Sequence, residues 1–203
     1  MLRRPRRLAA LASLTLTAGL LPVLASPASA FPGPGSAVFI NEFHYDSPST
    51  DVDEFVEVAG PVGQDLTGWS VVLYNGNDGA SYATLPLPAR IPAAGAVTVN
   101  APGLQNGAPD GIALVDGTTL VQFLSYEGAF VATNGPASGR TSTDVLVGET
   151  GFELSGQSLQ LTGSGSTYGD FTWARPARST RDGVNNNQTL NGQAGPAGRV
   201  PGD

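Results

Sequence analysis

The chain has 203 residues, a formal net charge of −7 at pH 7 and no cysteine, and all ten of its basic residues are arginine. This length suits one domain with tails, and an exported fold without cysteine must be stable without disulfides. A single histidine and no cysteine exclude an ordinary zinc site, and the acidic balance disfavours direct binding of nucleic acid.

Residues 1–30 have the pattern of a signal peptide. Four arginines precede an apolar run at 8–24, and the small residues Ala28, Ser29 and Ala30 form a cleavage site. The alternative is an uncleaved anchor helix, but the run is short for a bilayer and contains Pro22. We expect cleavage after Ala30 and a secreted, extracellular protein with no transmembrane anchor. Loss of four arginines would take the net charge from −7 to −11.

The rest of the chain reads as short strands separated by turns rich in Gly, Pro, Asn and Asp. We expect a Pro/Gly leader at 31–36, a domain at 37–174 and an extended to disordered tail at 175–203. Alternation of apolar and polar side chains predicts eight or nine strands. They cover 37–43, 53–59, 69–74, 81–87, 96–100, 112–115, 119–126, 158–162 and 170–173.

Three of these strands carry specific expectations. In the strand that begins at Trp69, the face that bears the indole is the expected core face, and Phe171 and Trp173 share the core face of the last strand. Strands 112–115 and 119–126 form a hairpin around Asp116-Gly117. Strand 81–87 is an edge strand because its prolines cannot donate to a ladder. Eight or nine short strands indicate an all-β sandwich or barrel, and the very unequal loops favour a Greek-key sandwich.

The motifs at 40–43 (INEF), 54–58 (EFVEV) and 65–69 (DLTGW) follow one another within about thirty residues. Together they resemble the bacterial branch of the lamin-tail domain family, and segments at 121–128, 134–137, 158–161 and 171–173 are similar to that branch as well. The resemblance implies an immunoglobulin-like β-sandwich that binds or tethers. In this family such domains are commonly attached to exported nucleases, phosphatases or proteases, whereas we expect this chain to carry the module alone.

The densest charge lies at 42–57, where six of sixteen residues are acidic. Asp46, Asp51 and Asp53 belong to one loop, and calcium accepts carboxylate oxygens in irregular geometry, so they are candidate calcium ligands. The alternative is a solvated acidic loop that serves solubility. Glu42 and Glu57 are expected to pair with an arginine such as Arg90 or Arg140.

His44 is the only histidine and hence the only candidate for a histidine base. Ser47 lies close by, but a nucleophile and a base this near in sequence rarely meet in a triad, whose members normally come from separate segments. We therefore expect a strand-end histidine and no catalytic residue.

The long loop at 128–150 offers Asn134, Arg140, Thr141 and Asp144 to a ligand, or else it folds over a sheet edge and protects it. The expected function is an exported, non-catalytic binding, adhesion or structural module whose partner is an extracellular protein or glycan. The alternative is a metal-dependent extracellular hydrolase, such as a nuclease or phosphodiesterase, or an accessory domain of one.

Overall fold

The computed structural model describes residues 35–48 and 50–192, so the predicted signal peptide and the end of the predicted tail lie outside the described part. Within that part, the prediction of an all-β sandwich is confirmed. The elements are β1 (Phe39–His44), β2 (Phe55–Ala59), β3 (Trp69–Asn75), β4 (Ala80–Pro86), β5 (Ala96–Asn100), β6 (Asp110–Asp116), β7 (Thr119–Tyr126), β8 (Thr143–Asp144), β9 (Gln157–Gly165), the 3₁₀ turn η1 (Tyr168–Asp170), β10 (Phe171–Arg178) and β11 (Gln188–Leu190). No helix in these residues is long and apolar enough to cross a membrane.

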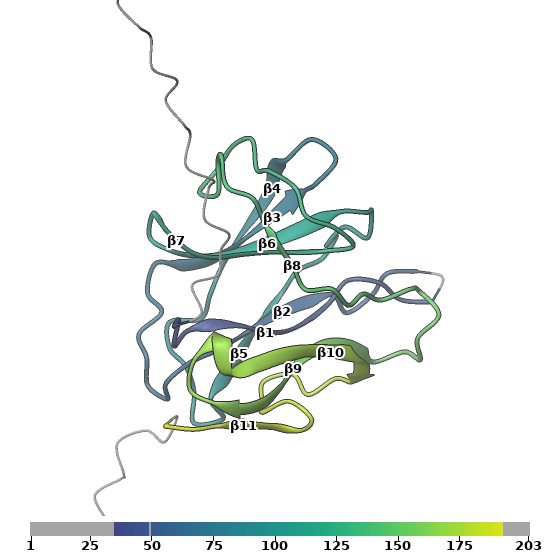
Figure 1. Ribbon diagram of the computed structural model, residues 1–203. Helices are drawn as coiled ribbons and strands as arrows, with labels where there is room; N and C mark the ends of the chain where they lie inside the picture. The colour runs from purple at the N-terminus through teal and green to yellow at the C-terminus, as the bar shows by residue number, and fades with distance from the viewer. Residues whose placement is uncertain (1–34, 49, 193–203) are drawn as a thin grey trace, which may run out of the picture.

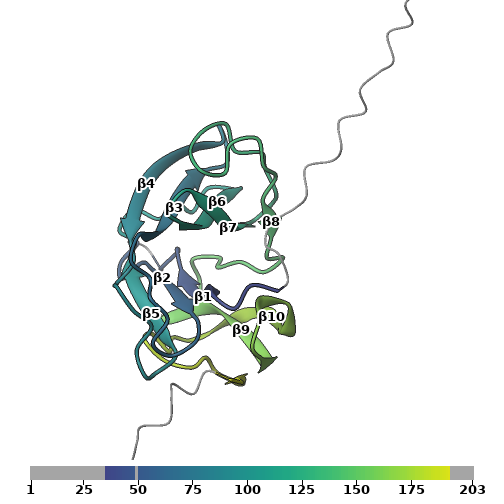
Figure 2. The same ribbon diagram turned by 90° about the vertical axis from the view of Figure 1, so that its left-hand side faces the viewer.

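The strands form two sheets that lie face to face (Figure 1 and Figure 2). Sheet 1 has the order β10-β9-β1-β2-β5, and β11 pairs with β9; sheet 2 has the order β4-β3-β6-β7-β8. The predicted hairpin is β6 and β7, in which Asp116 faces Thr119 across the turn. β4 is an edge strand of sheet 2, as its prolines predict.

The main core lies between the sheets and has an aromatic centre. Phe43 of β1 contacts Tyr126 of β7 and Trp173 of β10, at ring-centroid distances of 5.6 and 5.0 Å, and Tyr45 stacks on Tyr126 at 4.1 Å. Trp173 and Phe171 belong to this core cluster. Trp69 is only partly buried and packs against the cluster, so the indole expected at the centre of the core lies at its margin.

A β-bulge in β1 breaks the alternation that the sequence suggests. The register with β2 shifts between Ile40 and Glu42, so Phe39, Ile40 and Phe43 all join the core. The Ile40 N–H donates instead to Gln122 Oε1 of β7 at 2.6 Å, which links the two sheets through their interior.

The outer face of sheet 2 is covered by part of the long loop. Phe130, Ala132 and Ala137 pack on a second apolar cluster formed by alternate residues of three strands: Val72, Tyr74, Ala113, Val115 and Phe123. Farther along the loop, β8 pairs with the edge of β7. The loop therefore covers both a face and an edge of this sheet.

The outer face of sheet 1 is covered by the segment that follows β10. Glu42 accepts hydrogen bonds from Ser158 Oγ, Ser179 Oγ and Thr180 Oγ1 at 2.6–2.7 Å. Glu57 accepts them from Asn41 Nδ2 at 3.0 Å and from the Asp182 N–H at 2.6 Å. These two carboxylates thus bind hydroxyl and amide groups rather than the arginines expected beside them.

The sequence predicts that the domain ends at residue 174. In the structure the fold continues beyond that residue through the same segment. β10 continues to Arg178, and the chain then crosses the polar face of sheet 1 before β11 pairs with β9 in parallel. Asn185 is buried and donates through Nδ2 to the carbonyls of Asn41 and Leu161, at 2.8 and 3.0 Å. The segment has few apolar residues, such as Val184 and Leu190, and hydrogen bonds hold most of it against the sheet.

Candidate functional site

A cavity of about 330 Å³ lies at one end of the sandwich, where the loop after β1 meets the segment before β9 and the chain after β10. Figure 1 shows the loops before β2 and before β9 extending from the same end of the molecule. We call this cavity the loop-end pocket. It is lined by His44, Ser47, Val52, Asp53, Phe55, Ser155, Gly156, Gln157, Ser179 and Arg181.

Three polar side chains form a hydrogen-bonded row at the wall of the loop-end pocket. Ser47 Oγ lies 2.9 Å from His44 Nε2, and His44 Nδ1 lies 2.9 Å from Glu149 Oε1. His44 and Glu149 also form an ion pair when the imidazole is protonated. The expectation that Ser47 and His44 would not meet is therefore wrong, because the chain that leaves β1 places the hydroxyl beside the ring.

Glu149 is fixed by the backbone as well as by His44. Its Oε2 accepts from the N–H groups of Tyr45 and Asp46 at 2.7 and 2.9 Å, which are free to donate because β1 ends at His44. The Glu149 N–H in turn donates to the Tyr45 hydroxyl at 2.6 Å. The carboxylate therefore ties the loop before β9 to the end of β1.

This environment raises the pKa of His44 above its ordinary value. Burial acts to lower this pKa, but the hydrogen bond and the negative charge of Glu149 outweigh it, and a hydrogen bond with the Val52 backbone and the charge of Glu54 add to them. Tyr45 has its pKa raised, chiefly by burial, so its hydroxyl remains a neutral partner for Glu127 and Glu149.

Arg181 is the one cation among the residues that line the loop-end pocket. Its guanidinium lies over the ring of Phe55 at 4.5 Å from the centroid, and Nη2 donates to Asn100 Oδ1 at 2.6 Å. A guanidinium held by an aromatic face and a neutral amide keeps its charge and other N–H groups for a ligand.

The three predicted calcium ligands are only partly brought together. Asn106 Nδ2 donates to Asp51 Oδ2 at 3.2 Å and contacts Asp46 Oδ1 at 3.5 Å. Asp53 has a left-handed backbone, φ 59°, and lines the loop-end pocket instead. Within residues 35–48 and 50–192, no three His, Cys, Asp or Glu side chains are grouped so that they could hold a metal ion. Calcium binding remains a prediction from the sequence.

The four predicted ligand residues of the long loop do not line the loop-end pocket. Asn134 Oδ1 accepts from the Ser81 N–H at 2.8 Å, which ties the loop to β4. Arg140 is exposed, Thr141 forms an isolated bridge with Val131, and Asp144 belongs to β8. Two of the four, Asn134 and Asp144, thus take part in holding the loop against sheet 2, whereas Thr141 pairs with Val131 inside the loop.

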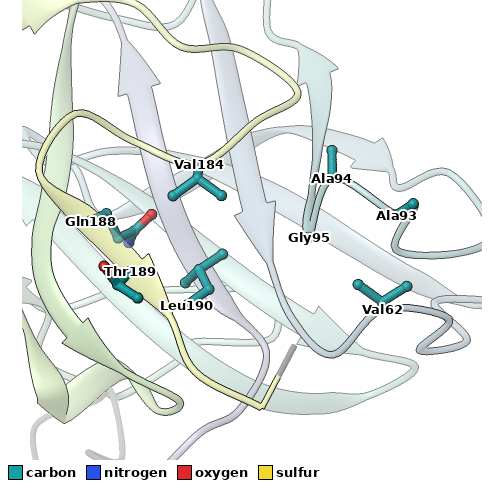
Figure 3. Close-up of a pocket in the computed structure, with 8 residues that line it drawn as sticks. All are labelled: Val62, Ala93, Ala94, Gly95, Val184, Gln188, Thr189 and Leu190. Atoms are coloured by element: carbon teal, nitrogen blue, oxygen red, sulfur yellow. The ribbon is translucent and has the colours of Figure 1, made fainter. Parts of the chain in front are cut away.

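A second cavity, of about 370 Å³, lies at the other end of β2. Figure 3 shows Val184 and Leu190 of the C-terminal segment across from Val62 and from Ala93 and Ala94 of a turn. Its other lining residues are Gly95, Gln188 and Thr189, so no titratable side chain faces it. This cavity can hold an apolar group, but it offers no acid, base or charge.

Comparison of the chain with protein-family models, with curated proteins and with solved structures finds no match in any of the three. The likeness to the lamin-tail family therefore rests on the motifs alone.

Proposed function

We propose that this protein is an exported binding module with a lamin-tail-like, immunoglobulin-like sandwich, and that it binds its ligand at the loop-end pocket. One observation carries the proposal. The outer face of each sheet is covered by the chain's own segments, whereas the loop end offers a cavity lined by polar side chains. The loop end is then the surface that contacts other molecules, as in many sandwiches whose binding residues lie in loops.

Exposed apolar side chains beside the loop-end pocket support this location. Phe152 and Leu154 are 92% and 78% exposed on the loop before β9, and Val52 is 53% exposed on the facing loop. Large apolar residues that are exposed near a cavity are typical of interaction sites. Burial of these three residues by a partner would add apolar contact to the hydrogen bonds that the pocket offers.

The ligand class follows from the charges at this end. Asp53 and Arg181 both line the pocket, and the rest of its lining is neutral apart from His44. Such a mixture suits a neutral polar group rich in carbonyl or hydroxyl oxygens, such as a segment of an extracellular protein or a glycan. The acidic net charge of the chain acts against polyanionic ligands.

The test is retention of the purified protein on immobilised cell-wall glycan and on extracellular proteins. We expect retention on at least one of them, and we expect Arg181→Gln to weaken it about tenfold, since a hydrogen bond to a charged group contributes about 1.5–3 kcal/mol. Arg90→Gln is the control, because Arg90 lies by Asp65 and does not line the pocket. No retention on any surface, or equal loss in both variants, would refute the proposal.

A further inference from the structure

The row formed by Ser47, His44 and Glu149 has the atom order of a hydrolytic triad. A serine oxygen meets Nε2 of the imidazole, and Nδ1 of the same ring meets a carboxylate, each at 2.9 Å. From this geometry we infer that the loop-end pocket hydrolyses small carboxylic esters, with Ser47 as nucleophile, His44 as general base and Glu149 as the positioning residue. This inference rests on the proposed function, because it places the reaction in the same pocket.

The hydrogen bonds around Glu149 set the tautomer of His44. An ionised carboxylate only accepts hydrogen bonds, and Glu149 already accepts two backbone N–H groups, so His44 Nδ1 carries a proton and donates to it. In the neutral ring, Nε2 then bears the lone pair that faces Ser47 Oγ. The other acceptor near this hydroxyl, the Val52 carbonyl, is farther away at 3.4 Å. The shorter distance to Nε2 favours donation of the serine proton to the base over donation to Val52.

The pocket is placed to receive an ester at this hydroxyl. Ser47 and His44 both line it, and so does Arg181, whose guanidinium is held over Phe55. Arg181 is exposed, and its positive charge stabilises the negative oxygen that develops when a carbonyl beside it is attacked. A volume of about 330 Å³ lies at the lower end for small-molecule sites, which favours a short acyl group.

The reaction takes place in two balanced halves. Ser47 Oγ bonds to the ester carbonyl carbon as its proton passes to His44 Nε2; the carbon–oxygen bond to the alcohol then breaks, and Nε2 returns the proton to the departing alkoxide. Water attacks the acyl-serine and gives a proton to Nε2, the acyl–Oγ bond breaks, and Oγ takes that proton back. One ester and one water thus become one acid and one alcohol.

A fluorophosphonate probe tests the nucleophile directly, because it forms a stable adduct with an activated serine. We expect one adduct per chain, mapped to Ser47 by mass spectrometry, together with hydrolysis of p-nitrophenyl acetate above the buffer rate. Both should be lost in Ser47→Ala and kept in Ser166→Ala, which removes an exposed hydroxyl that does not line the pocket. A folded protein that gives no adduct, or an adduct that persists in Ser47→Ala, would overturn the inference.

The variant Glu149→Gln distinguishes a role of Glu149 in orienting His44 from a role in the stability of the protein. We expect kcat for the ester to fall by about 10³-fold or more with KM little changed, since the amide can donate to Nδ1 and favour the wrong tautomer. Equal kcat for this variant and the unmutated protein, measured well below both melting temperatures, would contradict the role. Should the protein be retained on its ligand and yet give neither adduct nor hydrolysis, the binding proposal would stand and the catalytic inference would fall.

Discussion

At Glu57 a carboxyl group is completely buried on the outer face of sheet 1. Burial raises its pKa to about 8, the negative charge of Glu42 acts in the same direction, and the hydrogen bond from Asn41 opposes them. An isolated acidic residue in a strand normally indicates a solvent-facing position. Here the C-terminal segment covers it, so the protein carries a buried acid whose ionisation depends on pH near neutrality.

Because the pKa of Glu57 is higher in the folded protein than the ordinary 4.5, the folded state holds a proton that the unfolded chain releases between these values. The contribution of Glu57 to the free energy of unfolding therefore falls as pH rises from about 4.5 to 8, by up to about 1.4 kcal/mol per pH unit. Urea unfolding between pH 5 and 8 should show a smaller decline in Glu57→Gln than in the unmutated protein.

Glu153→Gln is the control for this measurement. The pKa of Glu153 lies below its ordinary value, because hydrogen bonds from Thr150 outweigh its slight burial. Its removal should leave the decline above pH 5 in place. A decline of equal slope in Glu57→Gln and the unmutated protein would mean that Glu57 is ionised in the folded state throughout this range.

At the scale of elements, β6 is apolar on both sides because both of its faces are covered. Ile112 and Leu114 face the main core, whereas Ala113 and Val115 belong to the cluster beneath the long loop. Gly111 comes just before them, and its missing side chain lets the ring of Phe130 lie directly on the strand. A Cβ there would come within 2.8 Å of two ring atoms of Phe130 and 2.9 Å of the Leu124 carbonyl oxygen.

Gly111→Ala should therefore lower the free energy of unfolding by about 1–3 kcal/mol, the usual cost of overpacking, because Phe130 must move off the sheet. Gly35→Ala is the control, since a Cβ at that position meets nothing within 4 Å. Chemical denaturation of the two variants measures the difference. If Gly111→Ala proved as stable as Gly35→Ala, the long loop would not be held tightly against sheet 2.

For the molecule as a whole, apolar groups cover the outer face of one sheet and polar groups cover the outer face of the other. The long loop covers sheet 2 with apolar side chains, and the C-terminal segment covers sheet 1 with hydroxyls, amides and backbone N–H groups. Covering a face with polar groups works only if every buried group finds a partner. The segment from Ser179 to Leu190 is consequently part of the fold rather than an appendage.

A chain that ends at Arg178 should lose more than about 3 kcal/mol of stability, because Glu42 would lose several hydrogen bonds to its carboxylate and Glu57 would lose the hydrogen bond from the Asp182 N–H. β11 would be lost as well. A chain that ends at Gly192 keeps every contact described above and serves as the reference. Thermal unfolding compares the two, and equal melting temperatures would show that the segment adds nothing to the stability of sheet 1.

Much of the sandwich was predictable because alternation along a strand is a local property. The face of β3 that bears Val71 and Leu73, the hairpin of β6 and β7 and the edge position of β4 all follow from residues within a few positions of one another. The Ser47 end of the polar row also had a local signal, since Ser47 lies three residues from His44. In triads such closeness argues against contact, but the chain that leaves β1 here places the Ser47 hydroxyl beside the His44 ring.

What the sequence alone determined was the fold class, since apolar periodicity and turn residues act over short distances. Glu149 is 105 residues from His44, and Arg181 is 81 residues from Asn100. Neither contact could be predicted from the local sequence, because the two residues of each pair lie far apart in the chain. The polar C-terminal segment likewise resembled a tail, because hydrogen bonds to a distant sheet leave no apolar pattern in the sequence. Only the tertiary structure decided the loop-end pocket, because its chemistry depends on chain segments that meet after the sheets have packed.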